Sequence, residues 1–298
     1  METWSEEVYF VPAPAKQNLA GIILSCGIHG DETGPIDVLR RLQTGLHNGT
    51  LIPARPLLLV FGNPQAMRQR RRYIDSNLNR LFGAQAASGI EAIRAEQLIE
   101  ACNQFQSRVA SIDLHLDLHS TIKPSYIERF SLTPVQSNGY PDCWQAALSQ
   151  AGFGALVRQT RRANTFCQFT HDQLAADSFT LECGSHQAGA VANNEKLWHW
   201  IIKLVSSNRT LSKERSAGDN QSHLEQFIVA EEILRRSDQF RFLLDEQEPN
   251  FTWHAAGTAI YQDTDNRLSI NGERFSLFLN SKVAVGQRAG LLLKRFQQ

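Results

Sequence analysis

The sequence predicts an α/β protein in which helices flank a mixed sheet, with a smaller β-rich domain at the C-terminus. Short apolar runs typical of buried strands recur between residues 21 and 184, and helical patterns separate them. Residues 224–298 instead form short alternating stretches separated by turn residues, which is typical of a small β domain. The chain has 298 residues, of which 42% are hydrophobic, and this is enough for one large domain and a smaller one.

The apolar patterns place the elements of the first domain in a definite order. The expected strands are 21–30, 57–63, 112–120, 126–133 and 178–184. Three helices are expected. One follows Pro35, and the others cover about 91–108 and 193–207. Residues 206–222 are polar and charged, so we interpret them as a linker or a surface excursion. We therefore predict one domain over residues 1–210, which would carry the chemistry, and a second over 222–298.

Charge and cysteine usage narrow the function. Thirty Lys and Arg balance thirty Asp and Glu, so no overall field favours nucleic acid, a membrane surface or a polyanion. The five cysteines form no CxxC pair, which favours reduced thiols. The N-terminus lacks the pattern of a signal peptide, and no run approaches the roughly 20 apolar residues of a membrane span. We expect a cytoplasmic protein with a small-molecule substrate.

His29, Glu32 and His119 are the strongest chemical pattern. Two imidazoles and one carboxylate are the ligands of an open catalytic zinc site, so we predict one Zn²⁺ per chain. His29 follows an apolar strand, and the turn that contains Gly30 would bring Glu32 back toward the same ion. The alternative is that these are unrelated polar residues.

The segment IDLHLDLHS at 112–120 predicts a strand with one polar face. Alternation places Asp113, His115, Asp117 and His119 on that face and the leucines on the other. His119, at the strand end, is the favoured ligand, and His115 competes with it. Asp117 is expected to orient a ligand imidazole.

Glu182 ends another apolar strand, in FTLECG. A carboxylate in this position is costly unless it is paired, hydrogen-bonded or functional. We interpret Glu182 as the general base that takes a proton from water and later passes it to the leaving amine. The alternative is a glutamate that accepts hydrogen bonds from a loop.

The segment 62–82 is rich in arginine and contains Arg72, Asn79 and Arg80 within one predicted loop. The planar guanidinium of arginine suits carboxylate recognition. A solvated face and a phosphate-binding patch are the alternatives, and no interleaved aromatic residues indicate nucleic acid.

Four segments, in this order, closely resemble the succinylglutamate desuccinylase and aspartoacylase family, which is related to zinc carboxypeptidases: GIHGDE (27–32), RRYIDSNLNRLF (71–82), DLHS (117–120) and TLECG (180–184). The similarity spans about residues 20–200, and NSKVAVGQRAGLLL (280–293) resembles the desuccinylase branch. Ser120, where the aspartoacylase branch has asparagine, also favours that branch. The resemblance implies a zinc carboxypeptidase-like domain followed by a smaller β domain.

The resemblance also implies roles for single residues. It matches His29, Glu32 and His119 to the zinc ligands, Glu182 to the catalytic glutamate, Arg72 to the arginine that polarises the scissile carbonyl, and Asn79 and Arg80 to the substrate-carboxylate binders. A second family arginine has no clear counterpart among Arg158, Arg161 and Arg162. Tyr261, in the C-terminal domain, is a candidate to reach the pocket.

The activity that the resemblance implies is zinc-dependent hydrolysis of N-succinyl-L-glutamate to succinate and L-glutamate, the last step of arginine breakdown by the succinyltransferase route. An N-acyl-aspartate deacylase would differ mainly in its pocket, and a zinc carboxypeptidase would cleave peptides. A metal-binding sensor without activity is the alternative from another class, although Glu182 and Arg72 speak against it. The sequence does not indicate the oligomeric state.

Overall fold

A mixed α/β domain and a C-terminal β-rich region make up the protein, as the sequence predicted. The computed structural model describes residues 1–14, 19–83, 88–136, 142–185, 190–207, 224–264 and 266–296. Most of the predicted linker, 208–222, lies outside these residues. Within the described ranges, every helix is too short or too polar for a transmembrane span.

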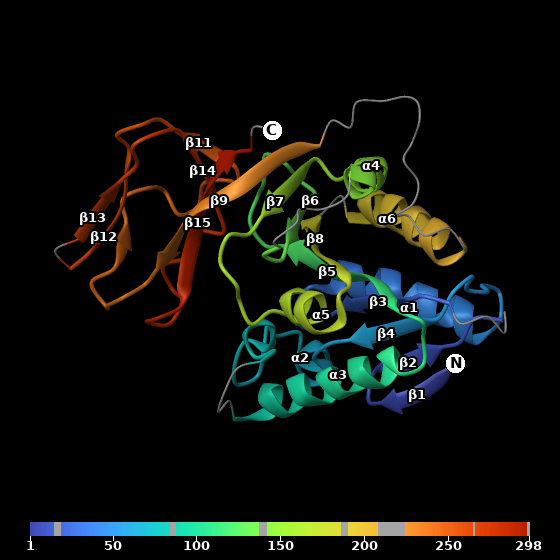
Figure 1. The fold of residues 1–298 in the computed structure, drawn as a ribbon. Helices are drawn as coiled ribbons and strands as arrows, with labels where there is room; N and C mark the ends of the chain where they lie inside the picture. The colour runs from blue at the N-terminus through green and yellow to red at the C-terminus, as the bar shows by residue number, and fades with distance from the viewer. Residues whose placement is uncertain are drawn as a thin grey trace.

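A mixed twelve-stranded sheet runs through the molecule (Figure 1). Its strands, in spatial order, are β1 (Glu2–Ser5), β2 (Val8–Val11), β4 (Leu57–Phe61), β3 (Gly21–Cys26), β5 (Ile112–Thr121), β8 (Asp177–Ser185), β6 (Phe130–Thr133), β7 (Ala155–Arg158), β9 (Glu225–Leu234), β15 (Arg288–Arg295), β14 (Arg274–Leu277) and β11 (Thr252–His254). Strands β4, β3, β5 and β8 are mutually parallel, and their carboxyl ends therefore lie at one edge of the sheet.

Helices cover both faces of this parallel part. They are α1 (Thr33–His47), α2 (Pro64–Gln69), α3 (Ile90–Gln106), α4 (Asp142–Gln150), α5 (Phe166–Leu174) and α6 (Ala190–Val205), with a short 3₁₀ turn, η1, at Leu78–Arg80. Apolar side chains of α1, α4 and α6 pack on one face of the sheet, while those of α3 and α5 pack on the other. Such two-sided burial is characteristic of parallel sheets.

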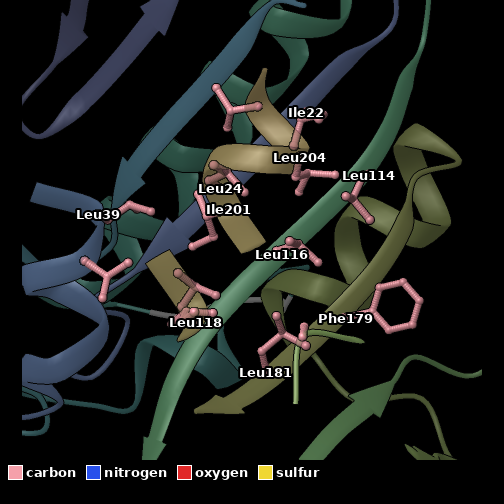
Figure 2. Close-up of a cluster of buried hydrophobic side chains, with 14 of the residues drawn as sticks. Ile22, Leu24, Leu39, Leu114, Leu116, Leu118, Phe179, Leu181, Ile201 and Leu204 are labelled. Atoms are coloured by element: carbon pink, nitrogen blue, oxygen red, sulfur yellow. The ribbon is translucent and has the colours of Figure 1, made fainter. Parts of the chain in front are cut away.

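Strand β5 shows how alternation separates core from chemistry. Leu114, Leu116 and Leu118 point into the core beneath α1 and α6, where Figure 2 shows them beside Ile201 and Leu204. The residues between them point to the opposite face. All but one of the ten residues of β5 are buried, so the polar face of this strand is enclosed as well.

The C-terminal region continues the large sheet, because β7 pairs in parallel with β9. Strands β15, β14 and β11 extend the sheet beyond β9, and β10 (Arg241–Phe242), β12 (Ala259–Asp263) and β13 (Asn266–Ser269) form a separate small sheet. The predicted smaller β-rich region is thus confirmed, but it shares a hydrogen-bonded sheet with the first domain.

Several elements differ from the sequence predictions. Strand β3 ends at Cys26, three residues before His29, and β6 begins only at Phe130. Before β6, Ser125 forms an isolated parallel bridge with Asn250 of the C-terminal region. The sequence patterns did not predict β1, β2, β7, α4 or α5, which are short or have little apolar contrast. Four cysteines (Cys26, Cys102, Cys167 and Cys183) are buried free thiols, and the side chain at 143 lies outside the described part.

Candidate metal centre and acidic-substrate site

The site forms at the sheet edge where the parallel strands end. His119, near the end of β5, lies directly opposite Glu182 in the register of β5 and β8. Neighbours in register on parallel strands point to the same face of a sheet. A buried imidazole and a buried carboxylate from distant segments thus share one edge.

The loop after β3 brings His29 and Glu32 to this edge. The strand turns away at Gly27, whose φ of 66° is a left-handed conformation that glycine adopts without strain. Gly30 is held against α2 so closely that a Cβ atom there would lie 2.2 Å from the carbonyl carbon of Ala66. Glu32 then occupies the N-cap position of α1. These glycines let a short loop present two side chains inward.

The three predicted ligands converge. Nδ1 of His29 lies 2.7 Å from Oε1 of Glu32, and Nδ1 of His119 lies 2.9 Å from Oε2 of the same carboxylate. Their ligand atoms all lie within 4.8 Å of one another, and the three residues are buried. Ligands of a tetrahedral zinc ion are separated by about 3.3 Å, given Zn–N bonds of about 2.0 Å. The donor set therefore fits a divalent ion with an open coordination position.

The outer nitrogens of both histidines face oxygen acceptors. Nε2 of His119 lies 2.8 Å from Oδ2 of Asp117, and Nε2 of His29 lies 3.2 Å from Oδ1 of Asn77. With a metal bound at Nδ1, each Nε2 would carry the proton and donate it to this outer oxygen, which would fix the tautomer and the orientation of the ring. Asp117 thus has the predicted orienting position, whereas nothing in the sequence pointed to Asn77.

The charges in this cluster depend on one another. Burial raises the pKa of Glu32, but the two histidines outweigh burial and hold this pKa well below its usual range. Burial lowers the pKa of His119, yet the Asp117 and Glu32 carboxylates raise it well above its usual value. The amide N–H of Ser120 also donates to Oε2 of Glu32, at 3.0 Å. Glu32 is therefore kept as an anion, the form that binds a cation.

His115, the competing ligand, has other partners. Its Nε2 lies 2.8 Å from Oγ of Ser25, and its Nδ1 lies 2.7 Å from Oγ1 of Thr170. Burial lowers the pKa of His115 to about 4, so the ring is neutral. Ser25 also donates to Asp117, at 2.6 Å. His115 therefore belongs to the hydrogen-bond network behind Asp117, and His119 is the histidine that meets His29 and Glu32.

Glu182 has the properties expected of a general base. Its side chain is 8% exposed. Burial raises the pKa of Glu182 most strongly. His119 lowers this pKa and Glu32 raises it, and the result is a pKa of about 7. A carboxyl group poised near neutrality can both accept and return a proton.

The arginine-rich segment forms one wall of the site. Nη1 of Arg72 lies 3.2 Å from Oε1 of Glu32, so the predicted polarising arginine reaches the ligand cluster. Asn79 is buried, and its Oδ1 accepts a hydrogen bond from the amide of Phe166 at 3.0 Å. Burial lowers the pKa of Arg80 to about 9, and the positive charges of Arg288 and Arg72 contribute. This side of the site is therefore cationic.

Arg288 is a residue that the sequence interpretation missed. It belongs to β15, and its guanidinium lies 3.8 Å from Oε1 of Glu232 on β9. Its influence on Arg80 means that the C-terminal region adds positive charge to the site. The segment 280–293 marked the resemblance, but nothing local indicated that an arginine within it influences the pKa of Arg80.

The role that the sequence left open among Arg158, Arg161 and Arg162 stays open, and each of these arginines has its own surroundings. Arg158 donates to Gln226 at 2.7 Å and stacks on Phe296, and Arg162 pairs with Asp172. Arg161 is exposed. Tyr261 lies on β12 and packs on Phe240, with ring centroids 5.3 Å apart, inside the C-terminal cluster. Its contact with substrate stays a prediction.

A cavity of about 200 Å³ lies at the opposite edge of the sheet, lined by residues that include Ile22, Arg55, Ile112 and Asp177. Ile112 and Asp177 begin β5 and β8, whereas His119 and Glu182 lie toward the ends of these strands. This cavity is therefore separate from the ligand cluster. The side chains at the carboxyl edge define the candidate site.

Comparisons with known proteins identify the family and the fold. A model described as the succinylglutamate desuccinylase/aspartoacylase catalytic domain matches residues 18–197, and one described as the AstE/AspA barrel-sandwich hybrid domain matches 222–296. A succinylglutamate desuccinylase of Pseudomonas aeruginosa is 36% identical, covering 95% of this chain and 86% of the relative. One of Pseudomonas putida is 35% identical, covering 97% and 88%. The crystal structure of succinylglutamate desuccinylase from Vibrio cholerae has a TM-score of 0.84 and 27% identity, covering 97% and 85%.

Proposed function

This chain belongs to the succinylglutamate desuccinylase/aspartoacylase family, and from this premise we propose that it is a zinc-dependent amidohydrolase that cleaves N-succinyl-L-glutamate to succinate and L-glutamate. The observation that carries the substrate class is the cationic wall beside the ligand cluster. Burial and the positive charges of Arg288 and Arg72 lower the pKa of Arg80, and the carboxylate of Glu232 acts in the opposite direction. Such a wall favours a substrate with several carboxylates, because guanidinium groups bind carboxylates in a fixed geometry.

His29, Glu32 and His119 would hold the ion, and Asp117 and Asn77 would orient the two imidazoles. When bound there, a zinc ion supplies Lewis acidity and lowers the pKa of water to about 7. Two neutral histidines and one carboxylate are a common ligand set for catalytic zinc, which supports zinc over a harder cation.

Glu182 takes the proton from the attacking water and returns it to the nitrogen of the departing glutamate. Its position opposite His119 supports this role, because the carboxylate faces the ligand cluster from the neighbouring strand. Its raised pKa of about 7 supports both halves of the transfer.

Arg72 donates to the carbonyl oxygen of the scissile amide as negative charge develops there. Its guanidinium is already within 3.2 Å of Glu32, so it needs only a small movement to reach a carbonyl placed beside the ligands. We assign Arg80, with the side-chain amide of Asn79, to binding the carboxylates of the glutamate part, and the planar guanidinium of arginine supports this role.

A substrate panel on metal-quantified protein tests this proposal. We expect the highest kcat/KM for N-succinyl-L-glutamate, lower values for N-acetyl-L-glutamate and N-acetyl-L-aspartate, no cleavage of peptides, and loss of activity with a chelator. Arg80→Ala should raise the KM for the diacid substrate by at least tenfold. Arg71→Ala, which removes an exposed arginine of the same segment, is the matched control. Preferred cleavage of N-acetyl-L-aspartate or of peptides would refute the proposed substrate.

A further inference from the structure

Glu91 is fully buried, and its carboxylate accepts hydrogen bonds from four donors. Its Oε1 accepts from the amide of Ile74 at 2.6 Å and from Nδ2 of Asn63 at 3.0 Å. Its Oε2 accepts from the amides of Asp75 at 3.0 Å and Ser76 at 3.2 Å. Three consecutive backbone amides therefore converge on one side chain, an arrangement otherwise typical of a bound anion.

These three amides belong to the segment that carries the substrate-facing groups. Arg72 lies two residues before Ile74, and Asn77, which faces His29, directly follows Ser76. Asn79 and Arg80 follow in η1, where Oδ1 of Asn77 accepts a hydrogen bond from the amide of Asn79 at 3.0 Å. We name residues 72–80 the arginine loop.

A second contact locks the same loop to α3. Oδ2 of Asp75 accepts from the amide of Ile90 at 3.2 Å, while Glu91, one residue further along α3, holds the amide of Asp75. The loop and the first turn of the helix thus exchange hydrogen bonds in both directions. The N-terminal end of a helix also favours the negative charge of Glu91.

We propose that Glu91 is a positioning residue, which acts through the arginine loop to set the geometry of the groups that recognise the substrate's carboxylates and that orient His29. Glu91 itself touches neither the ligand cluster nor Arg80 in any contact of the described residues. The identity of the substrate in this proposal rests on the proposed function. The positioning of the loop by Glu91 does not.

The ionised form of Glu91 is essential to this role. A carboxylate offers two acceptor oxygens, each of which serves two donors here. Burial raises the pKa of Glu91, but the hydrogen bonds from Ile74, Asn63, Asp75 and Ser76 outweigh burial and lower it. A glutamine keeps one oxygen and points an NH₂ group at two N–H donors, so one pair of amides loses its acceptor.

The kinetic test compares Glu91→Gln with Glu96→Gln, an exposed glutamate on the same helix. A displacement of about 1 Å in a substrate-binding group costs up to about 10²-fold in rate. We expect kcat/KM to fall by about 10- to 100-fold in Glu91→Gln, mainly through KM, with one zinc per chain retained. Glu96→Gln should match the wild type. If Glu91→Gln does not fold, Glu91→Asp, which keeps the charge but withdraws it by one methylene, should show the same direction.

A double-mutant cycle separates positioning from general destabilisation. If Glu91 acts through the loop, the loss in Glu91→Gln/Arg80→Ala should be at least fivefold smaller than the product of the two single losses. In the control pair, the loss in kcat/KM of Glu96→Gln/Arg80→Ala should equal the product of the losses of its two single variants. Losses that multiply in both pairs would overturn the positioning role.

Amide hydrogen exchange tests the loop without any substrate. In Glu91→Gln, residues 74–76 should exchange at least tenfold faster than in the wild type, with exchange in the centre of α3 unchanged. Unchanged exchange at 74–76 would overturn the proposal. A wild type that is inactive on every N-acyl amino acid would instead refute the proposed function, and the exchange result would still decide the role of Glu91.

Discussion

Oδ2 of Asp117 lies 2.8 Å from Nε2 of His119, two residues further along the same strand face. The carboxylate therefore orients the imidazole from the side away from Glu32. Oδ1 of Asp117 is itself held by Ser25 at 2.6 Å, so this orienting group is fixed in turn.

Replacing Asp117 by asparagine should weaken zinc binding by about 10- to 100-fold, because outer partners of ligand histidines set their tautomer and basicity. Competition with a chromogenic chelator measures the affinity. Asp113→Asn, on the same strand but bonded to Ser111, is the control and should leave the affinity unchanged. Equal affinities for the wild type and Asp117→Asn would contradict this role.

The two histidines of β5 should behave differently when replaced. His119→Ala should abolish bound zinc, because it removes one of three ligands. His115→Asn should retain about one zinc per chain, although losing buried hydrogen bonds would cost it roughly 1–3 kcal/mol of stability. Metal analysis of folded protein decides the matter. Zinc lost from His115→Asn but kept by His119→Ala would reverse the ligand assignment.

The metal-free protein should be stabilised by Glu182→Gln at high pH. Burial raises the pKa of Glu182 from 4.5 to about 7, so between these values the native state keeps a proton that the unfolded chain has lost. This contribution to stability is complete below pH 4.5 and falls as the pH rises through 7. Glutamine cannot ionise, so the variant does not lose this stability, and the loss in the wild type is at most about 3.5 kcal/mol at about 1.4 kcal/mol per pKa unit.

Urea unfolding of both metal-free proteins at several pH values measures this difference. Below pH 4.5 the difference between the two free energies of unfolding should be constant. Between pH 4.5 and about 7 the variant should become more stable relative to the wild type as the pH rises. A difference independent of pH would mean that the Glu182 carboxyl has an ordinary pKa. Glu182→Gln should bind zinc as the wild type does, but the zinc-loaded variant should lose most of its hydrolytic activity.

Arg72→Ala should lower kcat by about 10²–10³-fold, the usual loss when one donor to a developing oxyanion is removed. Zinc content should stay the same, because Arg72 contacts the ligand Glu32 without being a ligand. Steady-state kinetics with Arg68→Ala as the control measure this, since Arg68 pairs with Glu6 on the surface. An undiminished kcat would remove Arg72 from the chemistry.

Local patterns in the sequence were sufficient for the order of the main elements and for the nature of the ligands. Alternation along 112–120 placed His115, Asp117 and His119 on one face, and the structure keeps them there because a strand has a period of two. The glycines around His29 indicated a tight loop, and Gly30 lies against Ala66. The family resemblance assigned the arginine loop to substrate binding.

Tertiary structure decided which of these residues meet. His115 and His119 share a face, and the packing of the loop after β3 brings Glu32 to His119 and not to His115. The register of β5 and β8 sets Glu182 opposite His119, and a shift by one residue would turn the carboxylate to the other face. Asn77, Glu91 and Arg288 acquire their positions through contacts between segments far apart in the chain. Periodicity fixes the face on which a side chain lies, whereas its partners depend on how distant segments pack.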